Sequence, residues 1–461
     1  MTRLGVIVTV PDADGWRFAD GLPSGAVMGA SMDEGGNLWV AGGSAGVFVQ
    51  ENGHGSFRNF TLADGLHPYG YLRGQIARDY GVPDGSPADR NPSLDATPVV
   101  SVSGGPSGTA FVGYQGKPGC EDAWDNYGGT LANHEQADPS VYKSGDADKV
   151  TLMGGGIGVA HFDMVAGELL GREKLCSVWR ILYEHGSNRV WLGANHGFAL
   201  GFADNASVWE HVHPSVNDVH GYAMTDAYFG IALDQVPHSD GHGATVFDVW
   251  FGGMIRTTRF RFGEVGGDYW KAQPRTEYYA TSYPDGTSDA ADISRDALAQ
   301  AGYWNRMDIW PDPIGERRDP LHGDWRSREP DKNNPADWNY DNVSGIAAMK
   351  SGYAWIGSST NGLRLVDHDG KFAGDATQYL QSRQLGAVVR DPSDESVWIG
   401  YRDGHGVTRV MPDGSMLQYG EAALGANAGS AVWDIQIDAS GAQRRVIVAF
   451  RRGAVGVYSG R

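Results

Sequence analysis

The sequence has few cysteines, a shortage of basic residues and no long apolar run. Only two cysteines, Cys120 and Cys176, occur among 461 residues, which excludes a disulfide framework and a multi-cysteine zinc site. No stretch reaches the roughly 20 apolar residues of a membrane-spanning helix. Lysine and arginine total 37 against 56 acidic residues, for a net charge of −19. Nucleic acids bind to basic surfaces, so this balance argues against a nucleic-acid partner.

Glycine and aromatic residues, by contrast, are abundant. Glycine supplies 67 residues, tryptophan 15 and tyrosine 20, and no Gly-X-Y period is present, which excludes collagen. This composition is typical of many short strands joined by tight turns. The short apolar run from Leu4 to Val10 is too short for a secretory signal and is typical of a strand.

One sequence pattern recurs along the chain. It consists of an apolar triplet that usually contains tryptophan, then a glycine, a polar loop and a second short apolar run. The clear copies centre on Trp39, Trp191, Trp250, Trp355 and Trp398, and the degenerate ones on Phe111 and Ile447. Trp355 and Trp398 lie 43 residues apart, which is the length of a propeller blade. Runs this short, without a 3.6-residue period, exclude a helical repeat. The repeat predicts an all-β, seven-bladed β-propeller that spans residues 1–461 as one domain.

The repeat also predicts the order of the four antiparallel strands in a blade. The first strand, such as Ala431-Val-Trp-Asp-Ile435, precedes the tryptophan triplet, and the Gly-Val-Phe run and an aromatic run follow it. The chain ends on a third strand at Gly456-Val-Tyr458, so Gly15-Trp-Arg-Phe18 should supply the missing fourth strand and close the ring. The degenerate second unit places its third strand at Gly158-Val-Ala-His-Phe162.

Long inserts interrupt the repeat at residues 64–98, 115–149 and 283–340, with a smaller one at 213–226. The fourth strand before the third insert is expected at Thr276-Glu-Tyr-Tyr-Ala280. Given the predicted strand order, every insert follows a second or a fourth strand, so all of them should leave the propeller from one face. Clustered long loops favour a constructed binding site, although surface loops without a function are the alternative.

The stretch from Phe18 to Leu66 resembles the two-component-regulator propeller repeat. The matching residues are Asp20-Gly-Leu22, Asp33-Glu-Gly-Gly-Asn-Leu-Trp-Val-Ala-Gly42 and Asp64-Gly-Leu66. The resemblance implies a seven-bladed propeller that senses ligands outside the cytoplasm, in an extracellular or periplasmic location. A second, shorter stretch, Arg409-Val-Met-Pro-Asp-Gly-Ser-Met-Leu-Gln-Tyr419, is similar to the repeat of the streptogramin B lyases.

The loops after the second strands carry basic and hydrogen-bonding side chains on the face expected to bear the inserts. The candidate ligand-binding residues are Asn195, His196, Arg256, Asn361, Tyr401, Arg402, His405, Arg451 and Arg452. Arginine forks bind carboxylate, sulfate or phosphate, and aromatic residues of the inserts, including Trp304, could stack on sugars. We therefore expect an exported binding propeller for a glycan, another anionic ligand or a protein partner.

Two other functions remain open. A polysaccharide lyase would use His196, His405 or Tyr401 as its base, with arginine neutralising a uronate carboxylate. The sequence has no nucleophile elbow and no HExxH motif, so a non-catalytic role is preferred. A structural subunit of a surface assembly is the third hypothesis.

No cofactor is expected. A calcium site and a disulfide are each possible, but each also has a simpler interpretation. The acidic stretch with Asp285, Asp289 and Asp292 could hold Ca²⁺ or form a solvated turn. Cys120 and Cys176 are expected on the same face, as a disulfide or as two buried thiols.

Overall fold

The structure is a computed structural model. It describes residues 7–10, 14–19, 21–23, 27–66, 93–116, 177–194, 228–239, 342–368, 372–439, 441 and 443–460, with short segments between 71 and 308. No helix in the described part is both long and apolar enough to cross a membrane.

Antiparallel meanders of four strands are the building unit. The first consists of β3 (Gly29–Met32), β4 (Leu38–Ala41), β5 (Val47–Gln50) and β6 (Arg58–Phe60). Another consists of β25 (Val343–Ala348), β26 (Ala354–Ser358), β27 (Gly362–Val366) and β28 (Phe372–Asp375). The tryptophan triplet is the second strand in both, which confirms the predicted strand order.

The last two repeats gain a strand from the N-terminal segment. One sheet holds β29 (Leu385–Arg390), β30 (Val397–Tyr401), β31 (Val407–Val410), β32 (Met416–Tyr419) and β1 (Ile7–Thr9). The next holds β33 (Val432–Asp438), β34 (Arg445–Phe450), β35 (Ala454–Tyr458) and β2 (Trp16–Ala19). A short helix, α5 (Glu421–Leu424), connects the two sheets.

The middle of the chain forms three further sheets. The first holds β9 (Val99–Gly104), β10 (Ala110–Tyr114) and β12 (Thr151–Gly154). The second holds six strands: β13 (Ile157–Asp163), β14 (Glu168–Leu175), β15 (Val178–Glu184), β16 (Arg189–Ala194), β17 (Gly197–Phe202) and β18 (Asn205–Val212). The third holds β19 (Tyr228–Leu233), β22 (Asp248–Gly253), β23 (Arg256–Arg261) and β24 (Trp304–Asp308). Small pairings join β7 (Tyr71–Leu72), β8 (Ser86–Pro87) and β11 (Ala137–Asp138), and also β20 (His238–Ser239) and β21 (Thr245–Val246).

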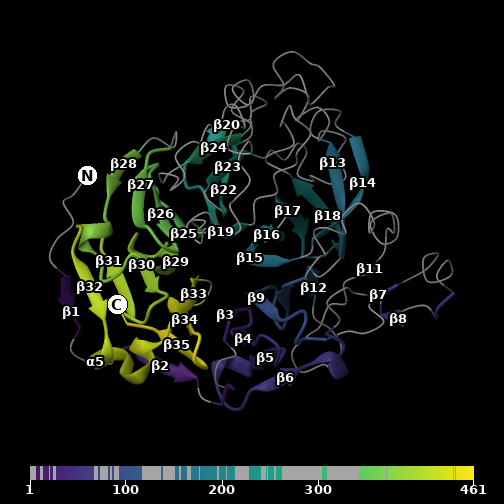
Figure 1. The fold of residues 1–461 in the computed structure, drawn as a ribbon, viewed down its shortest axis with the longest axis horizontal. Coiled ribbons are helices and arrows are strands. Elements are labelled where there is room, and N and C mark those ends of the chain that lie inside the picture. Colours follow the sequence, from purple (N-terminus) through teal and green to yellow (C-terminus); the bar gives the residue numbers. More distant parts are fainter. Residues whose placement is uncertain are drawn as a thin grey trace, which may run out of the picture.

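The innermost strands of the sheets contact one another in sequence around a centre (Figure 1). The order of these contacts is β3, β9, β15, β19, β25, β29 and β33, and β33 also contacts β3. The all-β propeller fold is therefore confirmed, and the contacts follow the order expected for the predicted ring. First strands from distant repeats face one another across its centre.

A tryptophan–carboxylate hydrogen bond explains why several repeats pair an acid with the tryptophan. The Trp39 Nε1–H donates to Asp33 Oδ2 at 2.9 Å, and the Trp250 Nε1–H donates to Asp234 Oδ2 at 2.7 Å. Each acid follows the first strand, and each indole is almost fully buried. The bond satisfies the polar edge of a large apolar side chain inside the sheet stack.

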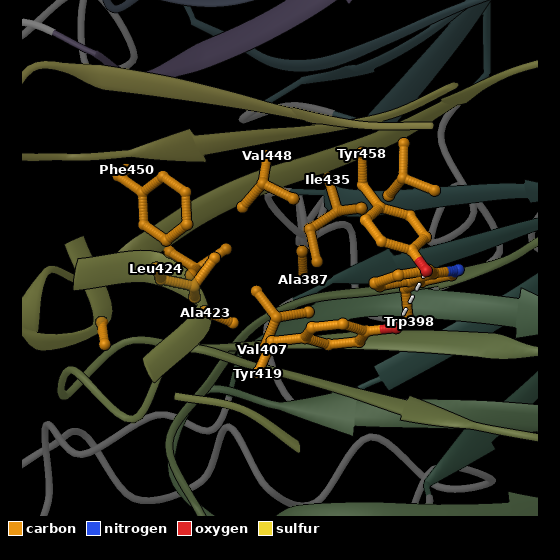
Figure 2. Close-up of a cluster of buried hydrophobic side chains, with 13 residues drawn as sticks. Ala387, Trp398, Val407, Tyr419, Ala423, Leu424, Ile435, Val448, Phe450 and Tyr458 are labelled. Atoms are coloured by element: carbon orange, nitrogen blue, oxygen red, sulfur yellow. Dashed lines mark hydrogen bonds between the residues drawn. The ribbon is translucent and has the colours of Figure 1, made fainter. Parts of the chain in front are cut away.

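The N-terminal segment ties two neighbouring sheets together. Strand β1 pairs in parallel with β32, and β2 pairs antiparallel with β35, which is the pairing expected for Gly15 to Phe18. The Trp16 ring packs 5.5 Å from that of Tyr419 and 5.2 Å from that of Tyr458. Figure 2 shows these two tyrosines beside Trp398 in the apolar cluster between the sheets.

Two strand assignments from the sequence are wrong. Residues Gly158 to Phe162 belong to β13, which pairs with β14 and β18 of the following sheet. The third strand on β10 is instead β12, in parallel orientation. The fourth strand next to β23 is β24, so Thr276 to Ala280 does not fill that place, and Trp304 is a strand residue rather than part of an insert.

The position of β24 as a fourth strand determines the face from which one long connection leaves the propeller. Residues 262–303 join the third strand β23 to the fourth strand β24. A third-to-fourth connection leaves an antiparallel meander at the face opposite the second-to-third loops. The prediction that all long inserts share one face is therefore wrong for this segment. Residues 61–98, 213–227 and 309–342 do join a fourth strand to the next first strand.

Ion pairs in the turn between β29 and β30 should make stability depend on acid pH. Burial raises the pKa of Asp394, but hydrogen bonds from Ser396 and the Arg409 guanidinium outweigh it, and the net pKa is lowered. A carboxylate with a lowered folded pKa stabilises the protein above its unfolded pKa of about 4, and this contribution is lost as pH falls through the folded pKa. In Asp394→Asn, we expect a lower melting temperature at pH 7 and a shallower decline below pH 4, measured by circular dichroism. An unchanged acid profile would contradict this role.

Candidate functional site

A cavity of about 200 Å³ opens at the end of the central channel where the first strands begin. Its lining comes from the first residues of β9, β15, β19, β25, β29 and β33, together with Met28 before β3 and Arg402. The loops after the second strands lie at this end, since an antiparallel meander brings them there. The cavity therefore lies on the face where the sequence places the ligand-binding loops.

Two arginines pack against one tryptophan at this mouth. The guanidinium carbon of Arg402 lies 4.5 Å from the ring centre of Trp433, and that of Arg451 lies 4.7 Å from the same ring centre. Trp433 is half-buried at the start of β33, and Arg402 lines the cavity. Cation–π contacts of this length hold planar guanidinium groups in place.

The repeat itself positions the two arginines. The Arg402 N–H donates to the carbonyl of Gln384 at 2.8 Å, and the Arg451 N–H donates to that of Ala431 at 2.9 Å. Each bond ties the residue after a second strand to the residue before the first strand of the same sheet. Equivalent positions in neighbouring repeats therefore bring both side chains to Trp433.

A glycine provides the space for one of these arginines. A Cβ on Gly386 would collide with the carbonyl oxygen of Val432 and would lie 3.2 Å from Cγ of Arg402. Any larger residue would therefore push β29 away from β33 and displace the arginine stem.

The electrostatics of the pair favour an anion. Burial lowers the pKa of the Arg402 guanidinium, and the neighbouring charge of Arg451 lowers it further. Among the described residues, no carboxylate forms an ion pair with either arginine. Two like charges thus share one indole without a counter-ion from this part of the chain. A negative group close to both would offset the burial of the Arg402 charge and the repulsion between the two guanidinium groups.

An ion pair crosses the channel below the cavity. Arg180 Nη1 on β15 donates to Asp434 Oδ1 on β33, and the Asp434 side chain is only 3% exposed. The Gln436 Nε2–H also donates to Asp434, at 3.1 Å from Oδ2. Arg180 lines this cavity and also the larger one at the opposite mouth. The pair therefore separates the two mouths of the channel.

The opposite mouth has a different character. Its cavity of about 460 Å³ is lined largely by aliphatic residues at the ends of the first strands. The charged groups near it are paired: Glu34 accepts from the Tyr183 hydroxyl at 3.1 Å, and Arg445 Nη2 lies 2.7 Å from Asp438 Oδ2. Burial and the bond to Glu34 raise the pKa of Tyr183 to about 12, so this phenol stays neutral.

The structure separates the candidates of the sixth repeat. The Tyr401 side chain is fully buried, with its hydroxyl 2.7 Å from Thr408 Oγ1, so it has no surface to offer a ligand and is a core residue. His405 is exposed and lies in a different hollow, with Nε2 3.6 Å from Asp403 Oδ2. Only Arg402 of this group faces the channel cavity.

The remaining candidates fall into two groups. Arg452 and Asn361 are exposed and do not line the cavity. Arg256 begins β23, but its side chain lies outside the described residues, as do Asn195 and His196. Both cysteines and the acidic stretch at residues 285–292 also lie outside them.

Sequence reasoning missed the residues that form the floor and walls of the cavity. Trp433 and Asp434 lie within the quoted first strand, and Trp179 and Arg180 occupy the corresponding place in β15. A large or charged residue two or three positions into a first strand is the signal that could have found them. Within the described part of the chain, no group of three metal-ligating residues could hold an ion.

Comparisons with known proteins identify no family for this chain. No protein-family model matches the chain, and no curated protein matches it in sequence. The crystal structure of Saccharomyces cerevisiae Sqt1 is similar at 10% identity, with 100% of both chains covered and a TM-score of 0.43. A structure of YCF48 bound to D1 peptide is similar at 10% identity, with 98% of both chains covered and a TM-score of 0.48.

Proposed function

We propose that this protein is a binding propeller that takes an anionic ligand at the mouth formed by Arg402, Arg451 and Trp433. The observation that carries the proposal is the arrangement of two guanidinium groups on one indole. One of these groups is largely buried, and neither pairs with a described carboxylate. Arginine forks recognise carboxylate, sulfate and phosphate through paired hydrogen bonds.

The shape of the mouth supports a small ligand or the end of a larger one. Its volume of about 200 Å³ lies below the roughly 300–1,000 Å³ of sites for drug-sized molecules. The Arg180–Asp434 pair forms the floor, so a ligand enters from one side only. An aromatic wall from Trp433, Trp179 and Phe229 completes the lining.

Neutralising one arginine should weaken binding without harming the fold. We expect Arg402→Gln and Arg451→Gln each to lower affinity for an anionic ligand about ten- to hundred-fold, since hydrogen bonds to charged groups contribute about 1.5–3 kcal/mol. Isothermal titration calorimetry with sulfate, phosphate and sugar acids measures the loss. Thermal shift reports the same binding, because a ligand of the native state raises the melting temperature.

Arg452→Gln is the matched control for this test. Arg452 follows Arg451 in the same exposed loop, and its backbone N–H donates to Ser430 Oγ at 3.0 Å. The substitution changes net charge by the same amount but leaves Trp433 untouched. Equal losses in Arg452→Gln and Arg451→Gln would reduce the effect to overall charge and would refute a site on Trp433.

The described residues favour binding over catalysis. None of the described residues that line the cavity is histidine or tyrosine, the residue types that the lyase hypothesis requires as a base. Together with the resemblance to ligand-sensing propellers, this supports an exported binding protein. An increase in ultraviolet absorbance on mixing with uronate polymers would reveal an unsaturated product and would support the lyase instead.

A further inference from the structure

Three polar side-chain atoms in the cavity lining have no hydrogen-bond partner in the described part of the chain. The Trp179 Nε1, Asn342 Oδ1 and Ser344 Oγ atoms are buried and make no hydrogen bond to any described residue, and all three residues line the same cavity as Arg402. Ser344 is only 9% exposed. Buried polar groups without partners are rare in folded proteins, and each one points to a ligand, an ion or a water.

The chemistry of the three atoms restricts the ligand. An indole N–H only donates, an amide oxygen only accepts, and a serine hydroxyl does both. A fully ionised sulfate or carboxylate offers acceptors alone, so it leaves the Asn342 oxygen without a partner. A hydroxyl group both donates and accepts, so a ligand with several hydroxyls could satisfy all three.

Charge and aromatic surface narrow the class further. A free amino acid would also supply donors, but its ammonium group would lie among Arg180, Arg402 and Arg451 and be repelled. Aromatic faces are present on opposite parts of the lining, where Trp179 and Phe229 pack with ring centres 5.6 Å apart and Trp433 stands at the mouth. Flat aromatic faces suit the apolar faces of a sugar ring.

We infer, on the basis of the proposed function, that the ligand is a polyhydroxylated carboxylic acid of the uronate type. The carboxylate binds Arg402 and Arg451. The ring hydroxyls hydrogen-bond to Trp179, Asn342 and Ser344. A free sugar acid and the terminal residue of an acidic glycan share this chemistry.

Three ligands of similar ring size separate the contribution of the carboxylate charge to affinity from that of the hydroxyl groups. Calorimetry should give the highest affinity for D-glucuronate and at least tenfold weaker binding for cyclohexanecarboxylate, which has the ring and the charge but no hydroxyls. Glucose, which lacks the charge, should bind at least tenfold more weakly than glucuronate as well. A disaccharide that ends in glucuronate distinguishes the two sources: tighter binding than the free acid identifies a glycan end, and weaker binding identifies the free sugar acid.

Two conservative variants test the hydroxyl contacts. Trp179→Phe keeps an aromatic ring and removes the N–H, and Ser344→Ala removes only the hydroxyl. Each should lower glucuronate affinity about three- to tenfold and leave cyclohexanecarboxylate binding unchanged. Because each variant removes an unpartnered polar atom, unliganded melting temperatures should be preserved, and circular dichroism checks the fold.

The outcomes distinguish this inference from the proposed function. Equal binding of glucuronate and cyclohexanecarboxylate overturns the inference and leaves the anion site standing. Tighter binding of a peptide with a free C-terminal carboxylate overturns it in favour of a protein ligand. If wild-type protein binds none of these acids, nor sulfate or phosphate, the proposed function itself fails.

Discussion

Deletion of residues 1–19 is expected to abolish cooperative unfolding and cause aggregation. The deletion removes β1 and β2, which pair with β32 and β35, and leaves both strands as open edges. It also removes Trp16, which packs against the cluster around Trp398. Loss of a fully buried tryptophan side chain costs about 3–5 kcal/mol, so loss of the partly buried Trp16 should remove an appreciable share of a typical stability of about 5–15 kcal/mol.

A shorter deletion is the control for this prediction. Removing residues 1–13 takes away β1 but keeps Trp16 and Phe18, which pack in the apolar cluster. We expect a modest decrease in melting temperature for this variant, and a monomer by light scattering. A synthetic peptide of residues 1–24 should restore cooperative melting to the longer deletion by strand addition. Native-like melting of the longer deletion without the peptide would show that β2 contributes little.

Arg180→Met is expected to lower the free energy of unfolding by about 3–5 kcal/mol, because it leaves a buried carboxylate without its counter-charge. The carboxylate is that of Asp434, 3% exposed on the other side of the channel. Urea denaturation at pH 7 measures the change. The double variant Arg180→Met/Asp434→Leu should recover most of the loss, since two apolar residues replace two charges.

Asp434→Asn separates stability from ligand binding. It removes the negative charge from the cavity and leaves the Arg180 guanidinium facing the mouth, so we expect higher affinity for the anionic ligand. Arg180→Met should lower that affinity, because it removes a cation and leaves Asp434 beside the site. If Arg180→Met lowers the free energy of unfolding by less than about 1 kcal/mol, water already screens the Arg180–Asp434 pair, and the channel is open at its middle.

The fold was predictable where each blade repeats its own local pattern. The tryptophan triplets at Trp39, Trp355 and Trp398 occupy second strands as expected, because the short apolar runs between glycine turns specify a meander within each repeat. The errors lie where an insert separates strand partners, at β12 and β24. There several segments have strand character, and the choice among them depends on contacts with neighbouring sheets.

The candidate site was predictable only in part. Arg402 and Arg451 were identified because each directly follows a second strand, and the structure brings them to one ring. Tyr401 precedes Arg402 by one position, ends β30 and is buried, whereas Arg402 lies in the turn after the strand and lines the cavity. The position of a residue relative to the end of the strand therefore decides which of these two side chains reaches the cavity.

The sequence by itself determined the strand order, the blade-sized period and the use of N-terminal residues as a fourth strand. The strand order depends on local alternation and turns within one repeat, the period on the comparison of successive repeats, and the N-terminal assignment on the fourth strand that the last repeat lacks. Only the tertiary structure decided the composition of the channel, where Arg180 meets Asp434 and Trp433 meets two loops. Residues 254 positions apart become neighbours there, because the ring joins first strands from all its repeats around one centre.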